Sequence, residues 1–205
     1  MAARSHPGWP ATLRSRNVEL RPLRVRDGGA WSRLRIADQA WLSPWEPTSS
    51  VPWEQRHTPW AFQALRMRLQ SQAREGSVLP FAVVYGDEIA GQLTVANVLR
   101  GVLRSGSVGY WIARRYAGRG VMPVAVALVV DHCFGRVGLH RIQVDIRPEN
   151  TASRRVVEKL GFREEARYRR YLDIDGAYRD HVGYALTVED CPEGLATRLA
   201  DDAGR

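Results

Sequence analysis

Several short segments of the chain alternate apolar and polar residues with a period of two, which is typical of strands with one buried face. Two of these segments, 81–85 and 88–98, flank Gly86-Asp87, a pair of residues that predicts a tight hairpin turn. Asp175-Gly176 predicts a second such turn. Further strands are expected around residues 18–23, 107–113, 140–146, 162–171 and 178–187.

Segments with a helical pattern lie between the strands. Between residues 60 and 74 apolar side chains recur at helical spacing, and Gly76 marks the expected end. The segment 43–60 contains too many prolines for one continuous helix and is predicted to be a loop near the acceptor site. Further helices are expected at 28–40 with Asp27 as the N-cap, from 121 to about 134, and at 151–160 with Gly161 as the end.

This order of elements predicts one α+β domain. Mostly consecutive antiparallel strands with one β-α-β crossover favour a mixed sheet. A chain of 205 residues with 44% apolar content fits a single core. We place the domain at residues 17–188, between a flexible N-terminal tail (1–16) and a C-terminal tail (189–205).

Composition bears on the cellular compartment. The longest apolar run, residues 121–130, is half of the roughly 20 residues that a membrane span needs, so it predicts a buried helix and no membrane contact. The first residues lack the apolar region of a secretory signal. The only two cysteines, Cys133 and Cys191, stand at no metal-binding or disulfide spacing. We therefore expect no metal and a cytoplasmic location.

A glycine loop, Arg115-x-x-Gly118-x-Gly120, follows the strand at 107–113 and opens the apolar helix. Glycines allow a ligand to approach the backbone, and a helix N-terminus offers free N–H groups to an anion. The loop is not a P-loop, because Val121-Met122 stand where lysine and serine or threonine belong. It also fails the dinucleotide pattern, because Pro123 occupies the position of the third glycine. It predicts a different cofactor that carries phosphate.

A second segment contains Asn150-Thr-Ala-Ser153 and, shortly after, Glu158-Lys-Leu-Gly-Phe162. Together with the glycine loop, it closely resembles the GNAT family of N-acetyltransferases, over about residues 17–188. Within that family the chain is most similar to the ribosomal-protein alanine acetyltransferases of the RimJ/RimL type, through Pro44-Trp45-Glu46-Pro47 and 175–180. The resemblance implies the GNAT fold, with a mostly antiparallel sheet splayed around an acetyl-CoA cleft and flanked by helices.

The resemblance also implies how acetyl-CoA, or coenzyme A, is held. Backbone N–H groups of the strand before the loop are expected to meet the thioester carbonyl, and this maps to Ile112 and Ala113. The loop is expected to hold the phosphates. The cofactor-binding residues implied in this way are Ile112, Ala113, Arg115, Gly118, Arg119, Gly120, Val121, Asn150 and Ser153.

Catalytic roles are expected for Ser153 as general acid and for Asn150 beside it. Many relatives have a tyrosine acid just before the Glu-Lys-x-Gly-Phe element, but this chain has Val157 there. Asn150 and Ser153 also suit the capping of the helix that begins near residue 151. A hydroxyl for the leaving thiolate must therefore come from Ser153 or from water.

The general base stays open, because Ser107 stands where relatives often have glutamate. We place Glu46 in the catalytic set, with Asp173, Asp175, His181 and a water relay as alternatives. The residues expected at the acceptor are Trp45, Trp53 and Tyr110.

The leading hypothesis is Nα-acetylation of a protein N-terminus, with a ribosomal protein as one candidate acceptor. A formal charge of +8 is compatible with ribosome association, but we favour a genomic bias toward arginine, which produces such a charge without any function. The resemblance also admits a homodimer. Two alternatives stay open: a small-molecule N-acetyltransferase acting on amino acids, polyamines or antibiotics, and a non-catalytic acyl-CoA-binding or ribosome-associated module.

Overall fold

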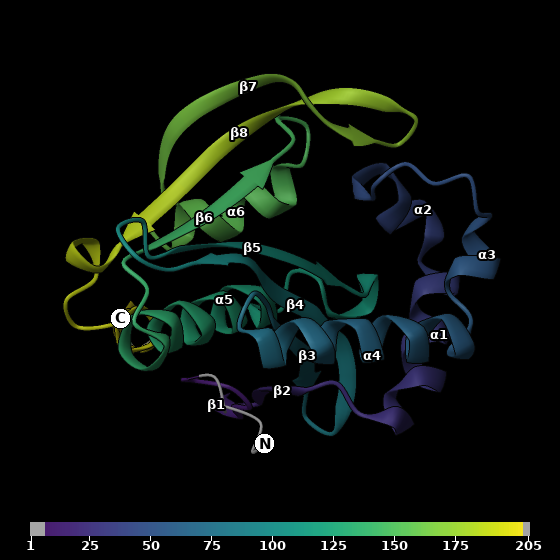
Figure 1. Ribbon diagram of the computed structural model, residues 1–205, viewed down its shortest axis with the longest axis horizontal. Coiled ribbons are helices and arrows are strands. Elements are labelled where there is room, and N and C mark those ends of the chain that lie inside the picture. The colour runs from purple at the N-terminus through teal and green to yellow at the C-terminus, as the bar shows by residue number, and fades with distance from the viewer. Residues whose placement is uncertain (1–6, 203–205) are drawn as a thin grey trace.

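The computed structural model describes residues 7–202, and within this range the strands form one eight-stranded sheet in the order β1-β2-β3-β4-β5-β6-β8-β7 (Figure 1). Neighbouring strands are antiparallel, except β5 and β6, which are parallel. The predicted α+β class with a mixed sheet is confirmed. The strands are β1 Leu13–Ser15, β2 Val18–Pro22, β3 Leu79–Tyr85, β4 Glu88–Leu99, β5 Ser105–Ile112, β6 Arg141–Ile146, β7 Arg163–Ile174 and β8 Ala177–Thr187.

The predicted helices are present, with small shifts of their ends. A π-helical turn, Cys133–Val137, continues α5, and two single turns, α2 and α3, follow α1. The helices of the described range are α1 Gly28–Ala37, α2 Gln39–Leu42, α3 Trp53–Arg56, α4 Pro59–Glu75, α5 Val121–His132, α6 Thr151–Lys159 and α7 Leu195–Asp202.

Helices cover both faces of the sheet. Along β3, Phe81 and Val83 belong to the core that contains α5, whereas Ala82 and Val84 belong to the core that contains α1 and α4. Because successive side chains of a strand point to opposite faces, a strand buried on both sides must be apolar throughout. This explains the continuous apolar sequence of β3.

Both predicted hairpin turns are confirmed. Tyr85 of β3 pairs directly with Glu88 of β4 across the first turn. In the second, Asp175 and Gly176 have φ values of 51° and 79°. Left-handed backbone at both central residues is the geometry of a two-residue hairpin turn, which aspartate and glycine tolerate best.

Asp27 occupies the predicted N-cap position of α1, but its side chain makes no capping hydrogen bond. Its carboxylate is 5% exposed and accepts two hydrogen bonds from Arg21, both of 2.8 Å. The backbone N–H of Arg24 donates to it as well, at 2.7 Å, and no side chain caps α1. A buried arginine requires a paired anion, and Asp27 supplies it.

The segment 43–60 is more helical than predicted. Ser43–Trp45 forms a 3-10 turn, α3 follows Pro52, and α4 begins at Pro59. Proline lacks only a hydrogen-bond donor that the first turn of a helix leaves unused. The prolines therefore start short helices in this segment instead of excluding them.

The described part of the N-terminal segment is packed against the domain. β1 pairs with β2, and the ring of Trp9 lies edge-on to Phe81 with 5.1 Å between centroids. Residues 7–15 therefore extend the domain beyond the predicted boundary at residue 17.

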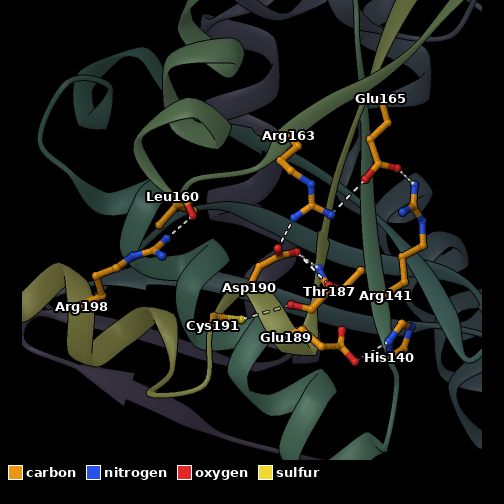
Figure 2. Close-up of polar contacts among 10 residues, drawn as sticks. All are labelled: His140, Arg141, Leu160, Arg163, Glu165, Thr187, Glu189, Asp190, Cys191 and Arg198. Atoms are coloured by element: carbon orange, nitrogen blue, oxygen red, sulfur yellow. Dashed lines mark hydrogen bonds and ion pairs between the residues drawn. The ribbon is translucent and has the colours of Figure 1, made fainter.

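The C-terminal segment is also packed, although the sequence analysis expected a tail from residue 189. Asp131 of α5 accepts hydrogen bonds from the N–H groups of Leu195 and Ala196, at 2.7 and 2.9 Å, and Leu195 is fully buried. Figure 2 shows that Arg163 of β7 joins Asp190 and Glu165, which anchors the segment after β8 to the sheet. These contacts depend on residues distant in sequence, which explains why the local pattern did not predict them.

Within residues 7–202, no helix combines the length and the apolar character that crossing a membrane would require.

Candidate active site

The sheet opens where β5 and β6 stop pairing. The two parallel strands are paired only at Ser105–Ser107 and Arg141–Gln143, although both continue beyond these residues. A cleft of about 370 Å³ begins at this point. Residues 108–111 of β5 and 144–147 after the paired part of β6 line two of its walls. This is the splayed cleft that the sequence analysis predicted.

The register of β5 on β4 determines which amides face the cleft. Ala113 donates its backbone N–H to the carbonyl of Ala90 at 2.8 Å, and alternate residues of an antiparallel strand bond to the same neighbour. The N–H groups of Tyr110 and Ile112 therefore point away from β4, toward the side from which β6 has separated. The Ile112 N–H, which was predicted to bind the thioester carbonyl, is free to bind a ligand in the cleft. The Ala113 N–H is not free, because it donates to the carbonyl of Ala90. The Tyr110 amide, which the sequence analysis did not consider, takes its place.

The glycine loop leads from β5 into α5 and presents an open backbone. Gly118 and Gly120 both have a φ of 75°, and no protein atom lies within 4 Å of a Cβ built on either. The first turn of α5 has no side-chain cap. Because Pro123 has no N–H, the free donors of this turn are Val121 and Met122. The Val121 side chain is 1% exposed, so only its backbone is available to a ligand.

Two of the loop's arginines differ in their present contacts. Arg115 forms an ion pair with Glu88 at 3.3 Å between largely exposed side chains, and such pairs contribute little to stability. Arg119 is exposed and has no ion pair among the described residues. Both guanidinium groups can therefore turn to a phosphate at low cost. The loop, its helix N-terminus and its charge fit a pyrophosphate.

Ser153, Asn150 and Tyr110 meet at the start of α6, and all three line the cleft. The Asn150 side chain accepts the Ser153 N–H at 3.1 Å, so the expected capping role is present. The Ser153 hydroxyl donates to the Tyr110 hydroxyl at 2.8 Å, and the latter donates to the Ser153 carbonyl at 3.3 Å. Burial raises the pKa of Tyr110 to about 12. The phenol therefore stays protonated at neutral pH, beside the predicted acid.

A buried arginine holds Glu46 at the edge of the cleft. Arg35 is 4% exposed and donates to Oε1 of Glu46 at 2.7 Å. Its other terminal nitrogen lies 2.9 Å from Nε2 of His57. Three indole rings surround the guanidinium, with centroids 5.0 to 5.6 Å away, and they belong to Trp31, Trp53 and Trp111. Stacking on aromatic faces stabilises a desolvated cation.

His57 completes this cluster as a neutral acceptor. Nδ1 lies 2.8 Å from the carbonyl of Trp53, which can only accept, so Nδ1 carries the proton and Nε2 accepts from Arg35. Burial, together with the charge of Arg35, lowers the pKa of His57 to about 4. Neither Arg35 nor His57 stands in a sequence motif that would have predicted this cluster.

Of the two tryptophans expected at the acceptor, only Trp45 lines the cleft. The guanidinium of Arg147 lies 5.3 Å from its ring centroid and donates to the carbonyl of Pro44 at 2.7 Å. Trp53 is 6% exposed, and its indole N–H donates to the carbonyl of Arg35 at 2.9 Å. Trp53 is therefore part of the arginine cluster and not of the cleft wall.

The loop that carries Glu46 is attached to the β7–β8 turn, and Figure 1 shows this hairpin extending toward α2. The N–H of Thr48 donates to the Asp173 carbonyl at 3.0 Å and its hydroxyl to the Asp173 carboxylate at 2.6 Å. The Asp175 N–H donates to the Glu46 carbonyl at 3.1 Å. Neither Asp173 nor Asp175 lines the cleft. Both serve this connection, which disfavours them as the general base.

Two further titratable groups face the cleft. His181 of β8 is 4% exposed, and its Nδ1 lies 3.0 Å from the carbonyl of Arg179. Asp145 of β6 accepts a hydrogen bond from Gln143 at 2.8 Å. Of the side chains considered as bases from the sequence, Glu46 and His181 therefore reach the cleft.

A splayed sheet whose strand β5 leads from the cleft into an open glycine loop and a helix defines the class of protein. Residues 17–163 match the family model for the acetyltransferase (GNAT) domain, and the chain belongs to this family. It is therefore an N-acetyltransferase, with acetyl-CoA as the acetyl donor.

Individual relatives give a finer comparison. The chain is 47% identical to Mycobacterium smegmatis RimJ, solved in complex with CoA-disulfide, with a TM-score of 0.94 over 98% of each chain. It is 33% identical to the Escherichia coli alanine N-acetyltransferase of ribosomal protein uS5, over 83% of this chain and 88% of that protein. It is 36% identical to the probable N-acetyltransferase YjcK of Bacillus subtilis, over 51% of this chain and 58% of that relative.

Proposed function

We propose that the protein transfers the acetyl group of acetyl-CoA to the N-terminal α-amine of a protein, and that the acceptor is a ribosomal protein. The cleft between β5 and β6 supports this, because it joins free β5 amides and Ser153 to a wall formed by Trp45, Glu46 and His181. A groove with a tryptophan wall and a carboxylate suits a positively charged chain end. The 33% identity to a uS5 alanine acetyltransferase supports the acceptor class.

In the proposed reaction the chain's own groups supply position and charge stabilisation. The N–H groups of Tyr110 and Ile112 are placed to bind the thioester carbonyl, whose oxygen gains negative charge during attack. The Ser153 hydroxyl, which donates to the Tyr110 oxygen in this structure, rotates to donate its proton to the departing sulfur. Asn150 holds the first turn of α6 in place. Glu46, anchored by Arg35, attracts the acceptor's ammonium group.

The decisive experiment combines purified protein and acetyl-CoA with a panel of acceptors. The panel holds ribosomal-protein N-terminal peptides that begin with Ala or Ser, together with polyamines, amino acids and aminoglycosides. Thiol release that depends on peptide, with the added mass at the α-amine, supports the proposal. If thiol is released only with the polyamines, amino acids or aminoglycosides, the protein is a small-molecule N-acetyltransferase. Cofactor binding without turnover on any acceptor would favour a binding module.

Replacing Gly120 by alanine is expected to weaken coenzyme A binding about 10-fold, which corresponds to about 1.4 kcal/mol. The new methyl group would occupy the open backbone surface at a φ of 75°, next to the free amides of α5. Isothermal titration with coenzyme A measures the effect. Gly101, with a φ of 71° and open space around it in the β4–β5 turn, is the matched control. Equal loss in G101A and G120A would reject a role in binding.

Replacing Ser153 by alanine is expected to lower kcat about 100-fold, which is the lower end of general acid-base contributions. The KM for acetyl-CoA should stay within a factor of about 3, because the hydroxyl acts mainly on the transition state. Steady-state thiol release with the best peptide measures both constants. Thr151→Ala, an exposed residue in the same helical turn, should keep the wild-type kcat. A kcat for S153A equal to that of T151A would remove Ser153 from the acid role.

A further inference from the structure

The acceptor must lose a proton before it can attack. An N-terminal amine has an ordinary pKa near 8, so at neutral pH it is mostly an ammonium ion without a lone pair. A group in the cleft that accepts this proton would raise the fraction of reactive amine. Histidine is the side chain whose charge ordinarily changes between pH 5 and 8, which suits this task.

The carboxylates at the cleft are already engaged. Oε1 of Glu46 pairs with Arg35 at 2.7 Å, and Oδ1 of Asp145 accepts from Gln143 at 2.8 Å. Both are better suited to attract the positively charged acceptor than to take its proton.

His181 has the required free nitrogen. Its Nδ1 lies 3.0 Å from the carbonyl of Arg179, and because a carbonyl only accepts, the neutral ring carries its proton on Nδ1. The lone pair then resides on Nε2, which has no hydrogen-bond partner among the described residues. His181 lines the cleft, and only 4% of the residue's surface is exposed. Nε2 is thus the basic ring atom that is left without a partner in the described structure.

The ring is held in this position by aromatic neighbours. Tyr171 of β7 lies edge-on to His181 with 5.8 Å between centroids, and Tyr171 stacks on Tyr168 at 4.7 Å. The Tyr168 ring in turn covers Gly183, where a Cβ would lie 2.8 Å from it. Tyr168 and Tyr171 of β7 lie beside the histidine, and the titratable or charged side chains that line the cleft with it are Glu46, Tyr110, Asp145 and Arg147.

We propose that His181 is the general base of the reaction, a proposal that rests on the proposed function. Nε2 takes one proton from the α-ammonium group and later releases it to solvent. The freed nitrogen lone pair forms the C–N bond to the acetyl carbonyl, and the C–S bond breaks with its electron pair on sulfur. The nitrogen loses its second proton to solvent as the amide forms, and solvent returns one proton to Ser153, whose own proton has gone to the sulfur.

The test is the pH dependence of His181→Gln. At pH 7, kcat/KM for the acceptor peptide should fall about 100-fold, within the usual range for a general base. The deficit should shrink at least about 10-fold by pH 9.5, because the α-amine then loses its proton without help. Added imidazole should restore part of the activity of His181→Ala. If His181 had only a structural role, kcat/KM of His181→Gln would be lowered by the same factor at every pH. Imidazole would then not restore the activity of His181→Ala.

Two further variants make the result specific. His140→Gln removes a histidine that pairs with Glu189 at 3.0 Å, outside the cleft lining, and should follow the wild-type profile. Asp145→Asn tests the competing base, and a pH-dependent loss in this variant but not in H181Q would overturn the proposal. Unfolding curves for each variant separate misfolding from lost catalysis. Wild-type protein without peptide-dependent thiol release would overturn the proposed function itself, a result seen before any variant is made.

Discussion

Replacing Arg35 by methionine is expected to lower the free energy of unfolding by about 3–5 kcal/mol, the usual cost of removing one partner of a buried ion pair. Methionine retains the apolar length of the side chain but leaves Glu46 and His57 without their common donor. Stacking on three indole rings is lost as well. Urea unfolding at pH 7.5 measures the change, and the melting temperature should fall by about 10 °C.

Two controls test the physical reason. Arg33→Met changes an exposed residue of the same helix and should alter stability by no more than about 0.5 kcal/mol. Adding Glu46→Gln to R35M should recover part of the loss, because the uncompensated carboxylate is then absent. If R35M were no less stable than R33M, the cluster would make no net contribution. Any loss of acetylation by R35M could then be attributed to the position of Glu46.

Features encoded by neighbouring residues could be predicted from the sequence. The pair Gly86-Asp87 specifies a two-residue turn, and Gly118 and Gly120 provide the left-handed backbone of the loop before α5. Asn150 caps α6 through Ser153, three residues away. In each case the structure depends on dihedral preferences or hydrogen bonds within a few residues.

Features that depend on register or on distant contacts could not be predicted in this way. Whether Ile112 or Ala113 presents its amide to the cleft depends on how β5 pairs with β4, and a shift of one residue reverses the answer. Trp45 and Trp53 belong to the same proline-rich segment, yet only the path of the folded chain places one in the cleft and the other on Arg35. Both tryptophans have prolines beside them in the sequence, so the local sequence does not distinguish their positions.

The identity of the general base also depends on contacts between residues that are distant in sequence. From the sequence, Glu46 was placed in the catalytic set, with Asp173, Asp175, His181 and a water relay as alternatives. Folding uses Asp173 and Asp175 to attach the Glu46 loop to the β7–β8 turn, and it pairs Glu46 with Arg35. His181 is the candidate whose reactive atom is left without a partner in the described structure. A buried partner that is distant in sequence, such as Arg35, thus changes the chemistry assigned to a residue without any local signal.

Stability is expected to fall as the pH is lowered from about 6.5 to 4, and His57 is the reason. Its pKa in the folded protein is about 4, compared with the ordinary value of 6.5. The unfolded chain therefore binds a proton in this range, whereas the folded protein does not. The stabilisation is fully present above pH 6.5 and is lost as the pH falls toward 4. At 1.36 kcal/mol for each pKa unit, the loss amounts to about 3 kcal/mol.

The measurement is the free energy of unfolding in urea at several pH values between 4.5 and 7.5, for the wild type and for His57→Gln. Glutamine retains a carbonyl oxygen that can accept from Arg35, but it does not titrate. Other histidines and carboxylates titrate equally in both proteins, so the difference between the two curves isolates His57. The wild type should lose about 2–3 kcal/mol more than H57Q over this range. Parallel curves would mean that His57 accepts the proton in the folded protein, and that the Arg35 cluster opens to admit it.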